Sequence, residues 1–149
     1  MKIDYSLTGK RALVAGGTQG IGRATAEAFA AAGASVCVVG RNQDGLDQVL
    51  AGLDRSAGQT HDALCVDFAR SGEASAAADA YAAAHGPIHV LLNNTGGPPA
   101  GFVIDAEPRE LIEWMERHLA TFQGLVRAVA PGMREAEYGR IINVISTSV

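Results

Sequence analysis

The stretch VAGGTQGIG, residues 14–22, contains four glycines in nine positions and follows directly on a short apolar run. Alanines at helical spacing come after it. Glycine permits positive φ and close approach of other atoms to the backbone, so the stretch predicts a tight turn from a strand into a helix.

Backbone N–H groups at such a turn, together with the helix dipole, favour a bound phosphate. In this interpretation Gly16 permits the tight turn, and Gly20 lets a diphosphate come near the backbone. Gly22 allows the helix to lie close to the sheet. A glycine-rich turn without any ligand is the alternative.

Five short apolar runs predict strands that are buried on both faces, as in a parallel sheet covered by helices. They lie at residues 11–15, 35–39, 63–66, 89–93 and 141–145. Helix-length segments separate them, at about 21–32, 43–57, 71–85 and 107–133. This alternation predicts a doubly wound α/β domain, in which ligands bind at the carboxyl ends of the strands.

Helical spacing predicts which residues each helix turns inward. In the first helix they are Ile21, Ala24, Ala28, Phe29 and Ala32, with Gly33 as the stop. In the second they are Leu46, Val49, Leu50 and Leu53. In the fourth, which starts at Pro108 and runs down to PGM at 131–133, they are Leu111, Met115, His118, Phe122, Leu125 and Val129. The preceding TGGPPAG, residues 95–101, is predicted to be a loop.

The composition, with 149 residues of which 48% are hydrophobic, predicts one compact domain over residues 1–149. A net charge of −4 without a basic cluster argues against a nucleic-acid partner. Without a long apolar run or a signal-peptide core, we expect a cytoplasmic protein that does not enter the membrane. Cys37 and Cys65 lie in apolar runs and are predicted to be buried, reduced thiols, and no metal site is expected.

Charged residues follow the second and third predicted strands. Arg41 can pair with the 2′-phosphate of NADP, where an acidic residue would instead bind the ribose of NAD. A solvated surface arginine is the alternative. Asp67 and Phe68 stand where an adenine would lie, although Asp67 can equally cap the following turn.

Amide and hydroxyl side chains follow the last two strands. The amides of Asn93 and Asn94 can bridge neighbouring strands or hold a ligand, and Asn93 is interpreted as a structural bridge. Ser146 is either an ordinary cap of the fifth strand or a catalytic hydroxyl.

Five motifs appear in order along the chain: TGK (8–10), GGTQGIG (16–22), VDF (66–68), NNTG (93–96) and GRIINVIS (139–146). In this order and spacing the whole chain resembles the short-chain dehydrogenase/reductase family, and is similar to its 3-oxoacyl-acyl-carrier-protein reductases. The resemblance implies a Rossmann-like fold and hydride transfer between NADPH and a carbonyl or alcohol substrate.

The resemblance also implies roles for individual residues. Those around the pyrophosphate would be Gly16, Thr18, Gln19, Gly20, Ile21 and Gly22, and those on the rest of the cofactor Arg41, Asp67, Phe68, Asn94 and Gly96. Ser146 matches the catalytic serine of the family, which hydrogen-bonds the substrate carbonyl.

Three positions depart from the family pattern. His118 stands in place of a polar asparagine and can relay a proton or hold a water, or is a buried structural histidine. Gln19 stands where NADP-preferring members often carry a basic residue, so NADP rests on Arg41 and NAD is possible. The family's Tyr-x-x-x-Lys pair does not occur, since the lysines are Lys2 and Lys10.

Complete family members continue with a further helix and two strands. We therefore expect residues 1–149 to be the cofactor-binding portion of a longer enzyme, with an uncovered apolar face at the fifth strand. Alone it is expected to be a poor catalyst, because a positioned general acid contributes about 10²- to 10⁴-fold. A non-catalytic dinucleotide-binding module is the alternative. The family also implies a homo-oligomer, which associates through the helix at about 107–133. The alternative is that the apolar stripe of this helix simply faces the sheet.

Overall fold

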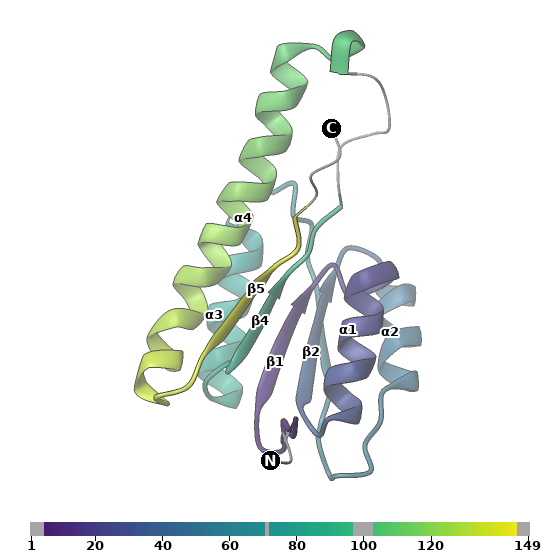
Figure 1. Ribbon diagram of the computed structural model, residues 1–149, viewed down its shortest axis with the longest axis vertical. Helices are drawn as coiled ribbons and strands as arrows, with labels where there is room; N and C mark the ends of the chain where they lie inside the picture. The colour runs from purple at the N-terminus through teal and green to yellow at the C-terminus, as the bar shows by residue number, and fades with distance from the viewer. Residues whose placement is uncertain (1–4, 71, 97–102, 146–149) are drawn as a thin grey trace.

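The computed structural model describes residues 5–70, 72–96 and 103–145 (Figure 1). Its strands are β1 (Arg11–Ala15), β2 (Ser35–Gly40), β3 (Asp62–Cys65), β4 (Val90–Asn93) and β5 (Arg140–Asn143). Its α-helices are α1 (Gly20–Ala31), α2 (Gln43–Gly52), α3 (Glu73–His85) and α4 (Pro108–Glu135), and a short 3-10 helix, η1, spans Val103–Asp105.

The strands form one parallel sheet in the order β3-β2-β1-β4-β5. The chain moves outward from β1 to β3 and then crosses to the other side of β1 for β4, so the strand order reverses between β1 and β4. This confirms the predicted doubly wound, Rossmann-like α/β fold, and it places the ligand-binding crevice of such folds above these two strands.

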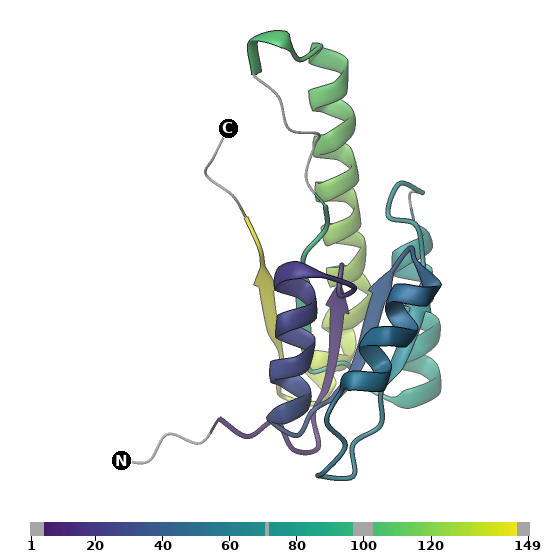
Figure 2. The ribbon, with the colours of Figure 1, turned by 90° about the vertical axis from the view of Figure 1, so that its right-hand side faces the viewer.

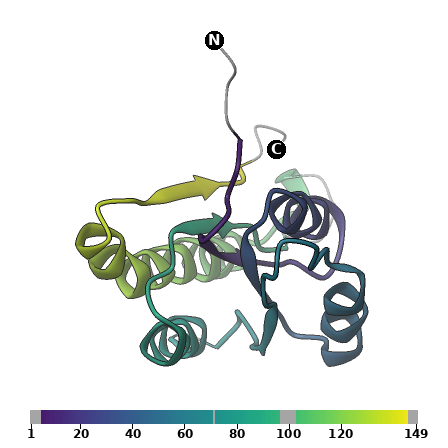
Figure 3. The ribbon, with the colours of Figure 1, turned by 90° about the horizontal axis from the view of Figure 1, so that it is seen from below.

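Alternate residues of the central strands supply two separate cores, because successive side chains of a strand point to opposite faces. Ala12 and Val14 pack with α1 and α2, whereas Leu13 and Ala15 pack with α3 and α4. Figure 3 shows the two helix pairs on opposite faces of the sheet. The central strands are therefore buried on both sides, as their continuous apolarity predicts.

The predicted inward face of α1 is wrong except for Phe29, which is half-buried against the core. Its buried residues are Gly22, Ala26 and Ala30, while Ile21 is 60% exposed and Ala24 is exposed as well. Alanine occurs on every side of this helix, so the apolar spacing did not define one face. The helix instead turns its smallest residues to the sheet, which lets the two backbones approach closely.

The second helix ends at Gly52, five residues before its predicted end, although Leu53 beyond it is still buried. Helix α4 begins at Pro108 as predicted but continues through Pro131 to Glu135. Pro131 removes one helical hydrogen bond and crowds the carbonyl of the residue four before it, and the packing of α4 on α3 and β4 offsets this cost.

Only the C-terminal half of α4 is packed against the sheet. Leu125 and Val129 are buried, whereas Leu111 is 41% and Met115 is 60% exposed. Figure 2 shows the N-terminal half of the helix extending beyond the carboxyl ends of the strands. The predicted stripe is thus continuous along the helix, but its upper part has no core to face in the described residues.

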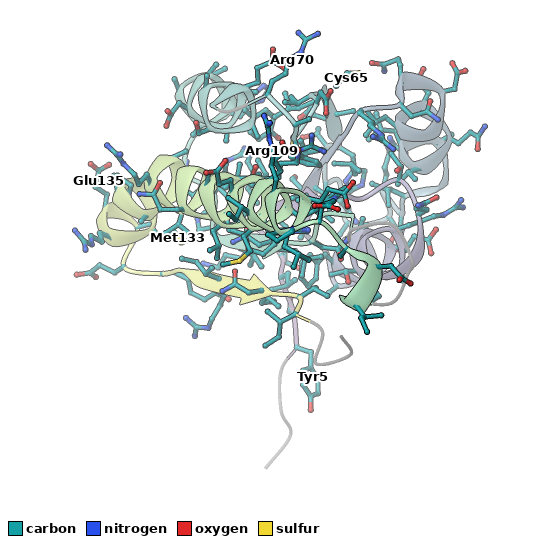
Figure 4. All side chains as sticks on the ribbon, turned by 90° about the horizontal axis from the view of Figure 1, so that it is seen from above. Tyr5, Cys65, Arg70, Arg109, Met133 and Glu135 are labelled. Atoms are coloured by element: carbon teal, nitrogen blue, oxygen red, sulfur yellow. The ribbon has the colours of Figure 1, made fainter. Side chains whose placement is uncertain are left out.

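The two edge strands are less buried than predicted. All four residues of β5 are exposed, and β3 changes from half-buried residues to the exposed Cys65. The prediction of a buried Cys65 is therefore wrong, while Cys37 in β2 is buried and its burial raises the pKa of its thiol. Figure 4 shows Cys65 on the side of the molecule away from β5.

Imidazoles bind backbone N–H groups at the amino ends of two strands. The N–H of Arg11 donates to Nδ1 of His89 over 3.0 Å, and the N–H of Val36 donates to Nδ1 of His61 over 3.1 Å. Nε2 of His61 lies 2.8 Å from the carbonyl of Asp54, which fixes its proton on Nε2. Both rings accept through Nδ1, so imidazole side chains bind backbone N–H groups at this end of the sheet.

Two features are absent from residues 5–70, 72–96 and 103–145. No helix in these ranges is long and apolar enough to cross a lipid bilayer. Histidine, cysteine and acidic side chains in the same ranges form no group of three or more that could hold a metal ion.

Candidate cofactor-binding site

The glycine-rich turn after β1 is held against the end of β4. Gly16 has a φ of +64°, and a Cβ on it would overlap the carbonyl oxygen of Asn94. The Asn94 side chain in turn donates from Nδ2 to the carbonyl of Gly16 over 3.3 Å. Gly16 is therefore required twice, for its positive φ and for the close approach of β4.

The other two glycines of the turn differ in their surroundings. A Cβ on Gly22 would overlap the Gly16 carbonyl oxygen, so this residue lets α1 pack beneath the turn. Gly20 has a φ of +53°, and among the described residues no atom outside its chain neighbours and its own helix lies within 4 Å of the position its Cβ would take. The space above Gly20 is thus open, as a site for a ligand requires.

The N-terminus of α1 points into this open space. Gln19 is its N-cap residue, and in the described structure no side chain caps the helix. The first N–H groups of a helix have no partner within the helix, and they carry the positive end of its dipole. The turn therefore offers bare backbone donors, the arrangement that binds phosphate in many nucleotide-binding folds.

A cleft of about 400 Å³ lies above the carboxyl ends of the strands. Its predicted lining residues are Gly16, Thr18, Gln19, Gly20, Ile21, Arg41, Asp67, Phe68, Asn94, Gly96 and His118. Gly22 lies under the turn and is not part of the lining. One cleft thus brings together residues that are up to 102 positions apart, from Gly16 to His118.

The lining is positively charged although the chain is acidic. Arg41 and Arg117 contribute two guanidinium groups against the single carboxylate of Asp67, whereas the whole chain has a net charge of −4. In the described structure neither arginine makes an ion pair with an acidic side chain. The cleft is therefore electrostatically suited to an anionic ligand.

The residues after β3 form a tight turn at the edge of the cleft. The Asp67 carboxylate accepts a hydrogen bond through Oδ1 from the N–H of Ala69 over 3.0 Å. Asp67 therefore caps this turn, which is one of its two predicted roles. The Phe68 carbonyl accepts a hydrogen bond of 3.5 Å from the hydroxyl of Thr121 on α4. This contact fixes the turn against the helix that forms the opposite wall.

His118 is half-buried in the cleft and not a core residue. Its Nδ1 lies 2.5 Å from the hydroxyl of Thr95, just after β4, and its ring meets Phe122 edge-on at 6.0 Å. The imidazole is thus oriented by the β4 loop while its other side remains accessible. Ser146, its predicted catalytic partner, lies outside the described residues.

Asn93 is fully buried, and its side chain donates from Nδ2 to Oδ1 of Asn143 over 2.8 Å. This hydrogen bond joins β4 to β5, in agreement with the predicted structural bridge. The Oδ1 atom of Asn93 is buried and has no partner in the described structure. A buried amide oxygen without a donor costs folding free energy.

Five lining residues were not predicted: Gly40, Ala69, Thr95, Trp114 and Arg117. The first three directly follow predicted strands, so strand-end position alone could have identified them. Trp114 lies four residues before His118, so helical spacing from His118 would have placed it on the same side of α4. Arg117 lies three residues after Trp114 and is a neighbour of Trp114 by the same spacing.

The short chain dehydrogenase family model matches residues 10–149. D-threitol dehydrogenase of Mycolicibacterium smegmatis is 36% identical over 96% of this chain and 55% of its own length. A metagenomic short-chain oxidoreductase in complex with NADP is 34% identical, with a TM-score of 0.83 over 95% of this chain and 64% of that one. A 3-oxoacyl (acyl-carrier-protein) reductase from Agrobacterium tumefaciens with NADP bound is 25% identical, with a TM-score of 0.86 over 97% and 55%.

The chain spans about half the length of the curated relatives it matches. The matches nevertheless extend over nearly all of the chain itself, and they include the glycine-rich turn and all five strands. The chain belongs to the short-chain dehydrogenase family.

Proposed function

We propose that residues 1–149 are the cofactor-binding portion of an NADP-dependent oxidoreductase that transfers hydride between NADPH and a small carbonyl or alcohol. The observation that carries this proposal is the open glycine-rich turn, with the bare N-terminus of α1, at the base of a cationic cleft of about 400 Å³. Such a turn binds the diphosphate of a dinucleotide. When bound, the nicotinamide supplies or accepts the hydride.

Each wall of the cleft would hold a different part of the cofactor. Thr18, Gln19, Gly20 and Ile21 would surround the diphosphate, on the turn that Gly16 and Gly22 shape. The adenosine half would lie over the ends of β2 and β3, and the nicotinamide half over the end of β4. The contacts would then be Arg41, Asp67 and Phe68 for adenosine, and Asn94 and Gly96 for nicotinamide.

NADP is favoured over NAD by the chemistry at the end of β2. Arg41 is exposed and has no acidic partner in the described structure, so its guanidinium is available to a 2′-phosphate. NADP bound to two solved relatives supports this choice. NAD stays possible for the same cleft, because the diphosphate contacts do not depend on the 2′ position.

Catalysis would use Ser146 and His118, with Ser146 hydrogen-bonding the substrate carbonyl. His118 would hold a water or relay a proton, with its ring oriented by Thr95. A carbonyl that accepts hydride also needs a proton donor, and the Tyr-x-x-x-Lys pair does not occur in residues 1–149. We propose that a longer polypeptide supplies this donor and that residues 1–149 alone bind the cofactor with little turnover.

Calorimetric titration with NADP and NAD, followed by an NADPH-oxidation assay on varied ketones, tests this proposal. Residues 1–149 should bind NADP more tightly than NAD and oxidise NADPH at most slowly. A longer polypeptide that carries the Tyr-x-x-x-Lys pair should bind equally well and turn over. Failure of the protein to bind either cofactor contradicts the proposal, and tight binding without turnover by any longer form favours the non-catalytic module.

The exposed half of α4 supports a second proposal, that the protein is a homo-oligomer. Ile112, Met115 and Leu119 lie on one side of this helix and are 56%, 60% and 61% exposed. Adjacent apolar side chains of this size mark association surfaces more often than free surfaces. Light scattering at several concentrations should give at least a dimer, and Met115→Glu should dissociate it; a strict monomer contradicts this proposal.

A further inference from the structure

The α4 wall of the cleft carries an aromatic ring and a cation that the proposed function leaves without a role. Trp114 and Arg117 both line the cleft, and the guanidinium carbon of Arg117 lies over the Trp114 ring at 5.1 Å from its centroid. The indole is half-buried, which gives the arginine a fixed support. The following inference rests on the proposed cofactor cleft.

The position of this pair along the cleft follows from the helix geometry. Thr121, one turn beyond Arg117, reaches the carbonyl of Phe68 with its hydroxyl. Residues four apart share one side of a helix, so Arg117 stands above the turn after β3. This turn, with Asp67 and Phe68, borders the adenosine half of the cleft.

Arg117 is also chemically available. Glu113 lies four residues before it, a helical spacing suited to an ion pair, but binds Arg109 instead, over 3.2 Å. In the described part of the chain Arg117 makes no ion pair, and its guanidinium lies over the indole of Trp114. A guanidinium is planar and has two faces. When one face contacts an aromatic ring, the other face is available to stack on a second ring.

We propose that Arg117, supported by Trp114, stacks on the adenine ring of the bound dinucleotide and acts as a specificity-determining residue for that base. Adenine would lie between the arginine and the turn after β3. Arg41 and Arg117 then divide the recognition of the cofactor: Arg41 binds the 2′-phosphate of NADP, and Arg117 binds the base common to NADP and NAD.

Calorimetric titration of the Arg117→Ala variant with NADP and with NAD tests this division. Both affinities should fall by the same factor, about fivefold, because both cofactors carry adenine. Arg117→Lys should recover only part of the loss, since an ammonium group is not planar. Binding of nicotinamide mononucleotide, which lacks adenine, should not change.

Arg127→Ala on the same helix is the matched control, because Arg127 is exposed and is not part of the cleft lining. This variant should bind both cofactors as the wild type does. Trp114 is the single tryptophan of the chain, so quenching of its fluorescence by NADPH provides a second readout in the wild type and in Arg127→Ala.

The outcomes separate this inference from the proposed function. A wild type that binds neither NADP nor NAD removes the proposed function, and this inference with it. A wild type that binds, with unchanged affinity in Arg117→Ala, overturns the stacking role alone. Selective loss of NADP affinity in Arg117→Ala also overturns it, because Arg117 would then contact the 2′-phosphate and not the base.

Discussion

Among the described residues, side chains bind backbone N–H groups at the amino end of the sheet and leave them uncapped at the carboxyl end. At the amino end, the N–H groups of Arg11 and Val36 are bound by the imidazoles of His89 and His61. At the carboxyl end, the first turn of α1 has no side-chain cap in the described structure, and the space above Gly20 is open. The amino end therefore contributes stability, and the carboxyl end is left available for a ligand.

The difference also separates two kinds of sequence information. At the carboxyl end glycines exclude side chains, so the pattern of the sequence itself indicates the site. At the amino end the closing residues come from elsewhere in the chain, since His89 is 78 positions from Arg11. An open end can be recognised from local sequence, whereas a closed end depends on the tertiary fold.

Gly16→Ala should have the largest effect on stability and cofactor binding, because Gly16 shapes the glycine-rich turn at the carboxyl end of the sheet. The new Cβ would overlap the Asn94 carbonyl oxygen at a residue with φ of +64°, which should cost roughly 2 to 5 kcal/mol of unfolding free energy. Cofactor binding should be lost as well. Chemical denaturation measures the cost, and the control is Gly52→Ala, whose new Cβ would meet no described atom within 4 Å outside its chain neighbours and its own helix. A cost similar to that of Gly52→Ala would refute the close-contact role.

Arg41→Asp should change cofactor choice without changing the fold. It removes a charge-assisted hydrogen bond to the 2′-phosphate, so NADP affinity should fall about tenfold to a hundredfold while NAD is largely spared. Competitive titration of the two cofactors gives the ratio. Arg127→Asp, an exposed residue outside the cleft lining, controls for the change in net charge. Equal weakening of both cofactors would show that Arg41 is not at the 2′-phosphate.

Glu137→Gly should stabilise the turn that follows α4 at the closed end. Glu137 has a φ of +50°, and the N–H of Tyr138 behind it donates to the carbonyl of Met133 over 3.1 Å. Glycine removes the steric cost of positive φ but adds backbone entropy to the unfolded state, for a net gain of about 0.5 to 1 kcal/mol.

The matched control is Glu135→Gly, in the last turn of α4, which should instead be destabilising by about 1 kcal/mol. Thermal or urea unfolding of both variants shows whether each substitution raises or lowers the free energy of unfolding. A loss of stability in Glu137→Gly would mean that the Glu137 side chain contributes more than its backbone strain costs.

His89 should make the closed end sensitive to acid, as the smallest of these effects. Burial first, then the charges of Lys10 and Arg11, lower the pKa of His89 below its ordinary value of 6.5. The folded state thus prefers the neutral ring, whose Nδ1 accepts from Arg11. This contribution to stability is complete above pH 6.5 and is lost as the pH falls below it.

In His89→Asn an amide oxygen can replace Nδ1 as the acceptor but does not titrate. The variant should therefore lose less stability than the wild type when urea unfolding is measured at about pH 7.5 and then at about pH 5.5. Equal losses in the two proteins would show that protonation of His89 does not act on this end of the sheet.

Strand positions and most of the cleft could be predicted from the sequence, because Gly16, Arg41, Asp67 and Asn94 all follow apolar runs. What could not be predicted depends on neighbours in space. Continuous apolarity does not reveal that a strand is at an edge, so Cys65 was expected to be buried. The role of Arg117 depends on α4 packing beside the turn after β3, which no local pattern records.

The central claim is that backbone N–H groups at the start of α1 bind the diphosphate of a nicotinamide dinucleotide. A ¹H–¹⁵N NMR titration of the labelled protein with NADP tests it directly. The account predicts large, saturable shifts at the amides of Gly20, Ile21 and Gly22, reproduced by NAD. Binding without shifts at these three amides, or no binding at all, would contradict it.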